Sequence, residues 1–333
     1  MAYEYGIDKT DWCLDESVFD NLGYTLLWEI SSGSKTTSYA AEDNKSKEKV
    51  TLTFFEVHKL FKRFQLSFLH EGLSSEEAVQ KAKEAVTNYI KSYELLLGRV
   101  HQLEHENIAQ LHSFCFREDM GLDKPFIISE YVPGSDFFTS TRGMNPIQMI
   151  SLFVPILEGL DFIHQNNMLH LNLKPSKVRI NREQKPPLVK LTDFGNAFLM
   201  EDQKTPLRGT AFYMAPEAIE EKREIINERT DLYSFAVLAY YCLTGKQAFP
   251  ERAQIHTDRK ALQEMIKHEG MPAPLLHHNK EIPQKLNDLI LKLLSPNPED
   301  REFFDAGEVL AYIYNAWPEA SKEMPFEQTS TII

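Results

Sequence analysis

The residues best suited to chemistry lie between His170 and Gly195. The stretch His170–Lys177 reads His-Leu-Asn-Leu-Lys-Pro-Ser-Lys, and Asp193 opens an Asp-Phe-Gly triplet further along the chain. Asn172 carries a carboxamide, which has no basic site to accept a proton. Lys177 brings an ammonium, which repels a metal cation but can contact phosphates directly. Asp193 is the one carboxylate of the set.

The elements that must position this cluster begin with strands and a long helix. Alternating apolar and β-branched residues broken by polar turns predict antiparallel strands at 24–30, 38–41 and 50–56. Ser74 and the glutamate three residues later form a capping box. Apolar residues at spacings of three and four then predict one long amphipathic helix over 74–104. The residues between the third strand and Ser74 are predicted to form a linker.

The second half of the chain predicts a larger helical region. Residues 126–134 read as a strand followed by a hinge, and 147–165 as an apolar core helix that leads into His170. Beyond Gly195 come three further motifs, which are Gly209-Thr210-Ala211-Phe212-Tyr213-Met214-Ala215-Pro216-Glu217, Asp231-Leu232-Tyr233-Ser234-Phe235-Ala236 and Pro298-Glu299-Asp300-Arg301.

In order and spacing these segments resemble eukaryotic-type protein kinases over residues 24–315. The resemblance implies an α+β, bilobal fold with a small antiparallel β-sheet lobe carrying a long helix and a larger, mainly α-helical lobe. It also implies that Asp231 holds the backbone of the catalytic loop and that Arg301 pairs with Glu217. The expected division of the chain is an N-terminal extension at 1–23, a small lobe at 24–132, a large lobe at 133–317 and a tail at 318–333.

The same resemblance shows that the catalytic positions are degenerate. Asn172 stands where the family has its catalytic base, and Lys177 stands where it has a metal-binding asparagine. Thr53 replaces the phosphate-anchoring lysine of the third strand. Leu96 occupies the position of the helix glutamate that pairs with this lysine. Only Asp193 remains as a metal ligand.

The nucleotide cleft implied by the resemblance is altered as well. One glycine of the phosphate loop remains, and polar groups replace the apolar residues that contact adenine. Among these polar groups, Arg179 can stack on the base, or it can fill the pocket and pair with an acid such as Glu130. The full set is Gly33, Lys35, Glu130, Val132 and Arg179. Weak or no binding of ATP is expected, with or without Mg²⁺.

Two functions follow from these observations. The first is a pseudokinase, which acts as a protein-binding scaffold or allosteric regulator in signalling. The alternative is an atypical Ser/Thr-type kinase, or another ATP-dependent transferase, that uses Lys35 or Lys177 in place of the missing lysine. Phosphoryl transfer depends largely on positioning, so the loss of a base at Asn172 slows transfer without forbidding it.

Composition narrows the partners and the compartment. The 333 residues carry a formal net charge of −13, which argues against nucleic acid or an anionic membrane as a general partner. Protein partners are expected instead, such as another kinase or a second copy bound through the helix 74–104. No apolar run is long enough to span a membrane. Three widely spaced cysteines suit a reducing compartment, so the expected location is cytoplasmic or another soluble intracellular compartment.

Overall fold

The computed structural model describes residues 23–33, 35–115, 125–201, 207, 209–255 and 259–321. The chain divides into two units. The first unit comprises Met1–Leu103 with Gln110–Tyr131, and the second comprises Glu104–Ala109 with Val132–Ile333. The division falls between Tyr131 and Val132, beside the predicted hinge, and the short segment Glu104–Ala109 is part of the second unit.

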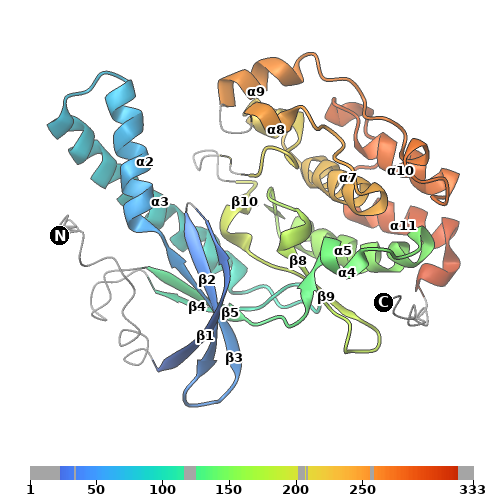
Figure 1. The fold of residues 1–333 in the computed structure, drawn as a ribbon, viewed down its shortest axis with the longest axis horizontal. Coiled ribbons are helices and arrows are strands. Elements are labelled where there is room, and N and C mark those ends of the chain that lie inside the picture. The colour runs from blue at the N-terminus through green and yellow to red at the C-terminus, as the bar shows by residue number, and fades with distance from the viewer. Residues whose placement is uncertain are drawn as a thin grey trace. The chain divides into compact units, whose positions relative to one another are not determined.

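The first unit contains a five-stranded antiparallel sheet in the order β1-β2-β3-β5-β4 (Figure 1). The three predicted strands are confirmed, with ends that extend by a few residues. Its strands are β1 (Tyr24–Ser32), β2 (Thr36–Asp43), β3 (Lys49–Phe55), β4 (Leu111–Cys115) and β5 (Phe126–Glu130).

Strand β3 shows why alternation in the sequence produces this sheet. Successive side chains of a strand point to opposite faces. Val50, Leu52 and Phe54 are buried in a core with residues of β2 and β5, whereas Thr51 and Thr53 lie on the other face. That second face is the one that carries the degenerate lysine position.

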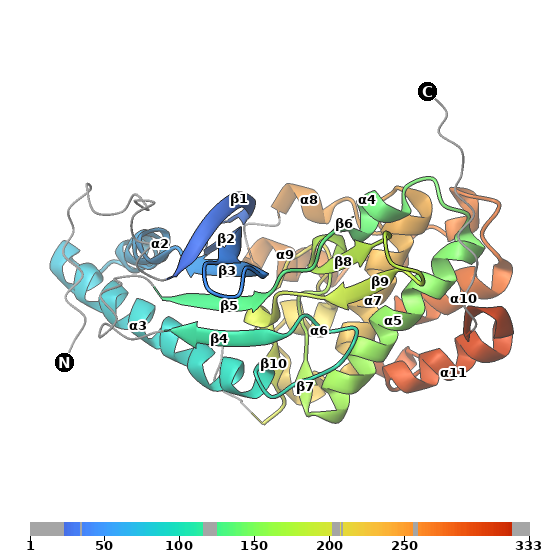
Figure 2. The same cartoon turned by 90° about the horizontal axis from the view of Figure 1, so that it is seen from below.

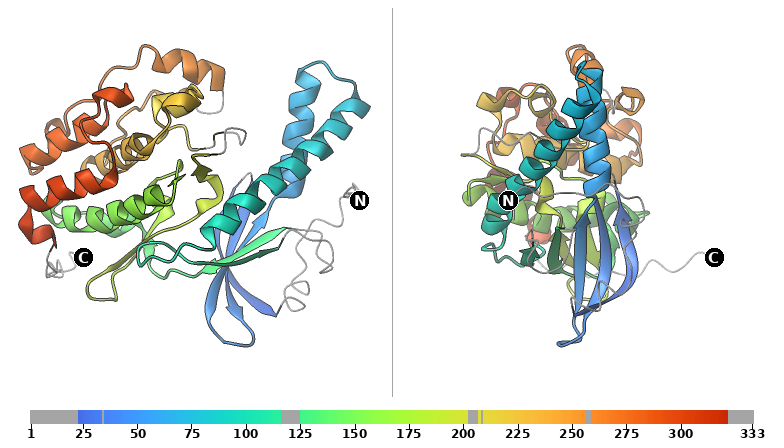
Figure 3. Two further views of the ribbon diagram at one scale, coloured as in Figure 1. Left: turned by 180° about the vertical axis from the view of Figure 1, so that it is seen from behind. Right: turned by 90° about the vertical axis from the view of Figure 1, so that its left-hand side faces the viewer.

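Two helices complete the first unit. Helix α3 (Ser75–Val100) begins at the predicted capping box, in which Ser74 accepts from the Glu77 backbone and the Glu77 carboxylate accepts from Ser74. Helix α2 (Val57–His70) packs along it, as Figure 3 shows from two sides.

The prediction of a linker before Ser74 was therefore wrong. The apolar residues Val57, Leu60, Phe61, Phe64 and Phe68 recur at helical spacing, and of these Phe64 and Phe68 contact Tyr89 and Lys81 of α3. The signal was present in the sequence, but it was short and interrupted by basic residues.

The second unit is mainly helical. Helix α7 is buried over most of its length, and α5 packs beside α11 (Figure 2). The α-helices are α4 (Phe137–Thr141), α5 (Pro146–Gln165), α6 (Pro216–Ile219), α7 (Glu228–Thr244), α8 (Arg252–Ile255), α9 (Arg259–Ile266), α10 (Gln284–Leu293) and α11 (Ala306–Ala316). Short 3-10 helices are η2 (Pro175–Lys177), η3 (Phe194–Asn196), η4 (Arg223–Ile225), η5 (Leu275–His277), η6 (Pro298–Asp300) and η7 (Pro318–Ser321).

Two small sheets in the second unit hold the predicted catalytic segments. One has the order β6-β8-β9, and the other pairs β7 with β10. The stretch His170–Lys177 connects β7 to β8, and Asp193 follows β9. The strands are β6 (Ser135–Asp136), β7 (Met168–Leu169), β8 (Val178–Asn181), β9 (Leu188–Leu191) and β10 (Phe198–Leu199).

Helix α5 is the core helix predicted over 147–165. Of the described helices, it is the one that is long and apolar enough to cross a membrane by length and hydropathy alone. Its side chains, Ile150, Phe153, Leu157 and Leu160 among them, are buried within the unit. Its apolar character is accounted for by packing inside the protein.

Candidate functional site: a degenerate catalytic loop

A buried carboxylate on α7 fixes the loop that contains Asn172. Asp231 accepts hydrogen bonds from the backbone N–H groups of His170 (2.7 Å) and Leu171 (2.8 Å), and His164 Nε2 lies 3.1 Å from the same carboxylate. Burial acts to raise the pKa of Asp231, but its contacts with His164 and His170 hold the pKa below its usual value. The expected architectural role of Asp231 is confirmed, because an ionised buried acceptor holds the loop backbone.

Asn172, at the position of the family's catalytic base, is linked by hydrogen bonds to a neutral hydroxyl and, through it, to a lysine. The side chain of Asn172 is buried, and its Oδ1 accepts a hydrogen bond from Thr210 Oγ1 at 3.0 Å. Lys174 Nζ in turn donates to Thr210 Oγ1 at 3.0 Å. Burial, followed by the charge of Lys177, lowers the pKa of Lys174. An amide oxygen that already accepts a hydrogen bond cannot act as a general base.

Lys177 makes an ion pair with Asp193. Its Nζ donates to Asp193 Oδ2, and Asp193 Oδ1 accepts from Gly195 N at 3.3 Å. Burial tends to raise the pKa of Asp193, but the charge and hydrogen bond of Lys177 hold the pKa below its usual value. The ammonium therefore contacts the carboxylate that is the candidate metal ligand.

This donor set does not suit a divalent cation. Mg²⁺ prefers several oxygen ligands, and here one family ligand position carries an ammonium while the other, Asp193, is neutralised by it. Over the ranges that the structure describes, no three His, Cys, Asp or Glu side chains lie close enough to hold a metal ion.

Asp193 also adopts a left-handed backbone conformation at φ 61°, a region that non-glycine residues rarely occupy.

Phe194 beside this ion pair is a packing residue. Its ring is buried, and its centroid lies 5.2 Å from that of His170. Burial lowers the pKa of His170. The Asp-Phe-Gly triplet thus contributes a core contact as well as the carboxylate.

In the first unit, Thr53 stands at the position of the family's strand lysine, and its hydroxyl contacts a residue on the neighbouring strand. Thr53 lies directly opposite Ser38 in the β2–β3 pair, and their hydroxyl oxygens are 2.8 Å apart. Thr51 on the same face donates to the Glu130 carbonyl at 3.4 Å. The Glu130 carboxylate accepts from the backbone N–H of Gln110 at 3.0 Å. Hydroxyl groups here bond to one another and to backbone, where the family pattern calls for a phosphate-binding ammonium.

Aromatic packing joins α3 to this sheet. The rings of Phe55 on β3 and Tyr93 on α3 lie 4.9 Å apart, edge to face, and the Tyr93 hydroxyl is 2.9 Å from that of Tyr89. Leu96 is buried one turn further along α3. A buried leucine at this position needs no cationic partner, which agrees with the loss of the lysine at Thr53.

The phosphate-loop residues Gly33 and Lys35 are held by backbone hydrogen bonds. Gly33 N donates to the Thr36 carbonyl at 3.0 Å, and Glu56 N donates to the Lys35 carbonyl at 2.7 Å. Ser34 lies outside the described residues. The loop therefore forms a hairpin end whose turn is closed by main-chain contacts.

Arg179 contacts main-chain oxygens. Its guanidinium donates to the carbonyl of Val132 at 3.4 Å and to that of Gly134. Gly134 has φ 96°, and a Cβ atom there would lie 1.9 Å from the Ile180 carbonyl oxygen, so only glycine fits. The predicted cleft residues Val132 and Arg179 are thus brought together within the second unit.

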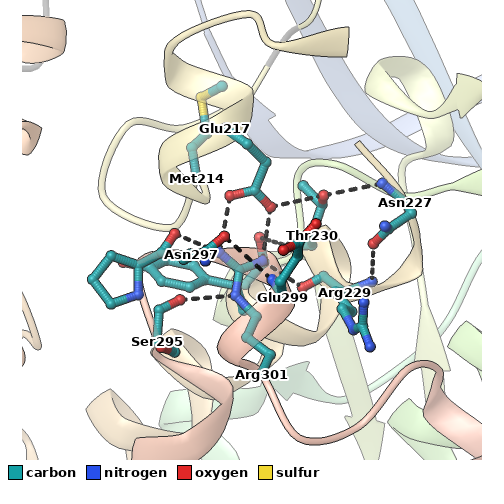
Figure 4. A network of polar contacts seen from close by, with 12 residues as sticks. Met214, Glu217, Asn227, Arg229, Thr230, Ser295, Asn297, Glu299 and Arg301 are labelled. Atoms are coloured by element: carbon teal, nitrogen blue, oxygen red, sulfur yellow. Dashed lines mark hydrogen bonds and ion pairs between the residues drawn. The ribbon is translucent and has the colours of Figure 1, made fainter. Parts of the chain in front are cut away.

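A buried ion pair fixes the end of the segment that follows Gly209 (Figure 4). Arg301 donates to both oxygens of Glu217, at 2.7 and 2.9 Å, and both side chains are almost fully buried. Thr230 also donates to Glu217, at 2.9 Å. The pairing expected between Arg301 and Glu217 is confirmed.

Sequence reasoning missed a second buried cation, Arg252. Its guanidinium pairs with Glu269, donates to the Met214 carbonyl at 2.8 Å and to Tyr233 Oη at 3.0 Å, and lies 4.4 Å from the Phe249 ring centre. Arg252 therefore holds the segment that ends at Met214. The sequence around Arg252 does not indicate a buried arginine, because a single arginine in a short polar stretch is equally typical of a solvent-exposed loop.

The anchored loop and the buried pair of Glu217 and Arg301, in a chain with one sheet unit and one helical unit, define a protein-kinase-like fold. The chain belongs to the protein kinase domain family, which matches residues 73–312. The predicted α+β fold class, with an antiparallel sheet lobe and a helical lobe, is thereby confirmed.

Curated relatives are named as serine/threonine-protein kinases. The ULK3 kinase of Xenopus laevis is 33% identical over 231 residues, which cover 67% of this chain and 46% of that protein. Human ULK3 is 32% identical over 227 residues, 67% of this chain and 44% of that protein. The PknB kinase of Mycobacterium leprae is 28% identical over 207 residues, 60% of this chain and 32% of that protein. The match thus spans less than half of each of these relatives.

Proposed function

We propose that this chain is a pseudokinase, which binds protein partners as a scaffold or allosteric regulator and transfers no phosphate at a significant rate. The main support is the ion pair between Lys177 and Asp193, because the chain's own ammonium neutralises the remaining metal ligand. The amide of Asn172, bonded to Thr210, supplies no base. The proposal includes weak or absent ATP binding and a soluble intracellular setting.

Nucleotide binding is the first test. Thermal unfolding and calorimetric titration would be carried out with ATP plus Mg²⁺, and again with ATP plus a chelator. We expect a shift in Tm below about 1 °C in both conditions, because a ligand stabilises the fold only at concentrations near or above its Kd. A low-micromolar affinity that requires Mg²⁺ would contradict the proposal.

The names of the relatives favour one second candidate, an atypical kinase that retains slow transfer. Under this alternative Lys35 or Lys177 replaces the strand lysine, and the missing base at Asn172 slows transfer. Asn172→Asp alone should then produce measurable transfer to a basic protein substrate. Under the pseudokinase proposal the same variant stays inactive, because Thr53 and Lys177 are unchanged.

A further inference from the structure

Helix α2 presents a basic face with an apolar centre. Lys62, Leu66 and His70 follow one another at intervals of four residues, so they form a row along the helix. Lys59 and Arg63 form the adjacent row. All five side chains are exposed, and 48% of Leu66 is accessible to solvent.

This basic face stands out against the charge of the whole chain. Helix α2 contains no acidic residue, whereas the chain carries a net charge of −13. The side chains of Lys62 and Arg63 make no hydrogen bond or ion pair with any other residue that the structure describes. The helix also precedes the residues that the family model matches, 73–312.

The opposite face of α2 is anchored. Val57 and Leu60 are buried, and the ring centroids of Phe64 and Tyr89 on α3 lie 6.3 Å apart. Figures 1 and 3 show the two helices side by side. The helix is about 21 Å long. Because its apolar side packs against α3, its basic face is exposed to solvent in a fixed orientation.

We propose that the basic face of α2, formed by Lys59, Lys62, Arg63, Leu66 and His70, binds an acidic segment of a protein partner. Carboxylates of the partner would pair with the cations, and an apolar side chain would cover Leu66. This inference rests on the proposed function, since it names the class of partner that the scaffold binds.

Charge complementarity favours a short protein segment over a membrane surface. Electrostatic interactions are screened within about 8 Å at physiological ionic strength. A short acidic segment on α2 therefore experiences mainly the local cations. An extended anionic surface would also approach the remainder of a chain with net charge −13, which repels it.

Lys59 connects this face to the phosphate-loop hairpin. Its Nζ donates to the Gly33 carbonyl at 3.3 Å and lies 3.4 Å from the Glu56 carboxylate, which also accepts from Thr37. A partner carboxylate competing for Lys59 would release the Gly33 carbonyl. Binding on α2 should therefore increase hydrogen exchange in the hairpin 33–37.

The test uses the full chain and a fluorescein-labelled helical peptide in which glutamates and leucines recur at helical spacing. Fluorescence anisotropy should show micromolar binding that weakens on the order of tenfold from about 0.05 to about 0.5 M salt. The double variant Lys62→Glu/Arg63→Glu should weaken binding about tenfold or more. The matched control Lys91→Glu/Lys260→Glu, which makes the same charge change at exposed sites on α3 and α9, should alter binding less than about twofold.

Four results of the peptide and vesicle assays would overturn the proposal. They are absence of peptide binding, equal binding of a glutamine-for-glutamate peptide, an equal effect of the control variant, and preferential binding of phosphatidylserine vesicles. Self-association of the chain that is lost in Lys62→Glu/Arg63→Glu, measured by sedimentation, would also overturn it in favour of a second copy. The assay contains no nucleotide, so its failure leaves the test of ATP binding intact.

Discussion

At the scale of single residues, each polar or charged side chain at an altered catalytic position has a partner inside the protein. Thr53 bonds to Ser38, Asn172 accepts from Thr210, and Lys177 pairs with Asp193. An unpaired polar or charged group in a folded chain is costly, so these partners make the substitutions compatible with a stable fold. The side chains at these positions are therefore satisfied by hydrogen bonds within the protein.

The first prediction concerns Lys177→Met. The folded-state pKa of Asp193 is lowered, so its stabilising contribution is present above the unfolded value of about 3.9 and is lost as the pH falls through the folded value. The Asp193 side chain is 39% exposed, which limits the loss at pH 7 to less than about 1 kcal/mol. Urea unfolding should show that the difference from wild type disappears at acidic pH. Lys285→Met is the control, and a difference that grows on acidification would contradict the assignment.

At the scale of elements, buried cations hold the segment between Gly209 and α6. Arg301 joins Glu217 to the loop before α11, and Arg252 joins Met214 to α8 and α7. Within residues 209–217, Glu217 is thus held by its ion pair with Arg301, and the Met214 carbonyl by a hydrogen bond from Arg252.

The second prediction concerns Arg301→Met. It leaves the buried Glu217 carboxylate without its cation and should lower the free energy of unfolding by about 3–5 kcal/mol. Adding Glu217→Gln should recover part of this loss, because the charge is removed while the bond from Thr230 can remain. Lys292→Met, which breaks the exposed pair with Glu302, should cost less than about 1 kcal/mol. Equal losses in the single and double variants would exclude this explanation.

At the scale of the whole molecule, the degenerate positions are divided between the two units. Thr53 and Leu96 belong to the first unit, and Asn172, Lys177 and Asp193 belong to the second. Chemistry that depends on both sets cannot be recovered by repairing one unit. Architectural contacts such as Asp231 with the loop backbone are complete within the second unit, so they do not depend on the altered positions of the first unit.

The third prediction concerns recovery of the family pattern. The combined substitutions Thr53→Lys, Leu96→Glu, Asn172→Asp and Lys177→Asn should confer Mg²⁺-dependent ATP binding, measured by calorimetry. Neither the first pair nor the second pair should do so alone, because each leaves the charges of the other unit unchanged. Strong binding with only one pair repaired would show that the other positions are not limiting.

Local patterns predicted those features that depend on neighbouring residues. The strand alternation of β3 and the capping box at Ser74 and Glu77 are set by contacts within a few residues, so the sequence was sufficient. The helix α2 was missed because a short stripe interrupted by Lys59, Lys62 and Arg63 also suits a linker. Its packing against α3 stabilises it, and that contact is not visible in α2 alone.

The sequence by itself determined the acid–base character of Asn172 and Lys177, because this character follows from residue type, and the spacing of the motifs identified the family. Only the tertiary structure decided where those groups are bound. The partners Asp193, Thr210 and Ser38 come from separate strands and loops. The basic face of α2 likewise depends on which side of the helix α3 covers. The functional group of a side chain is set by its residue type, but its contacts depend on how distant segments fold together.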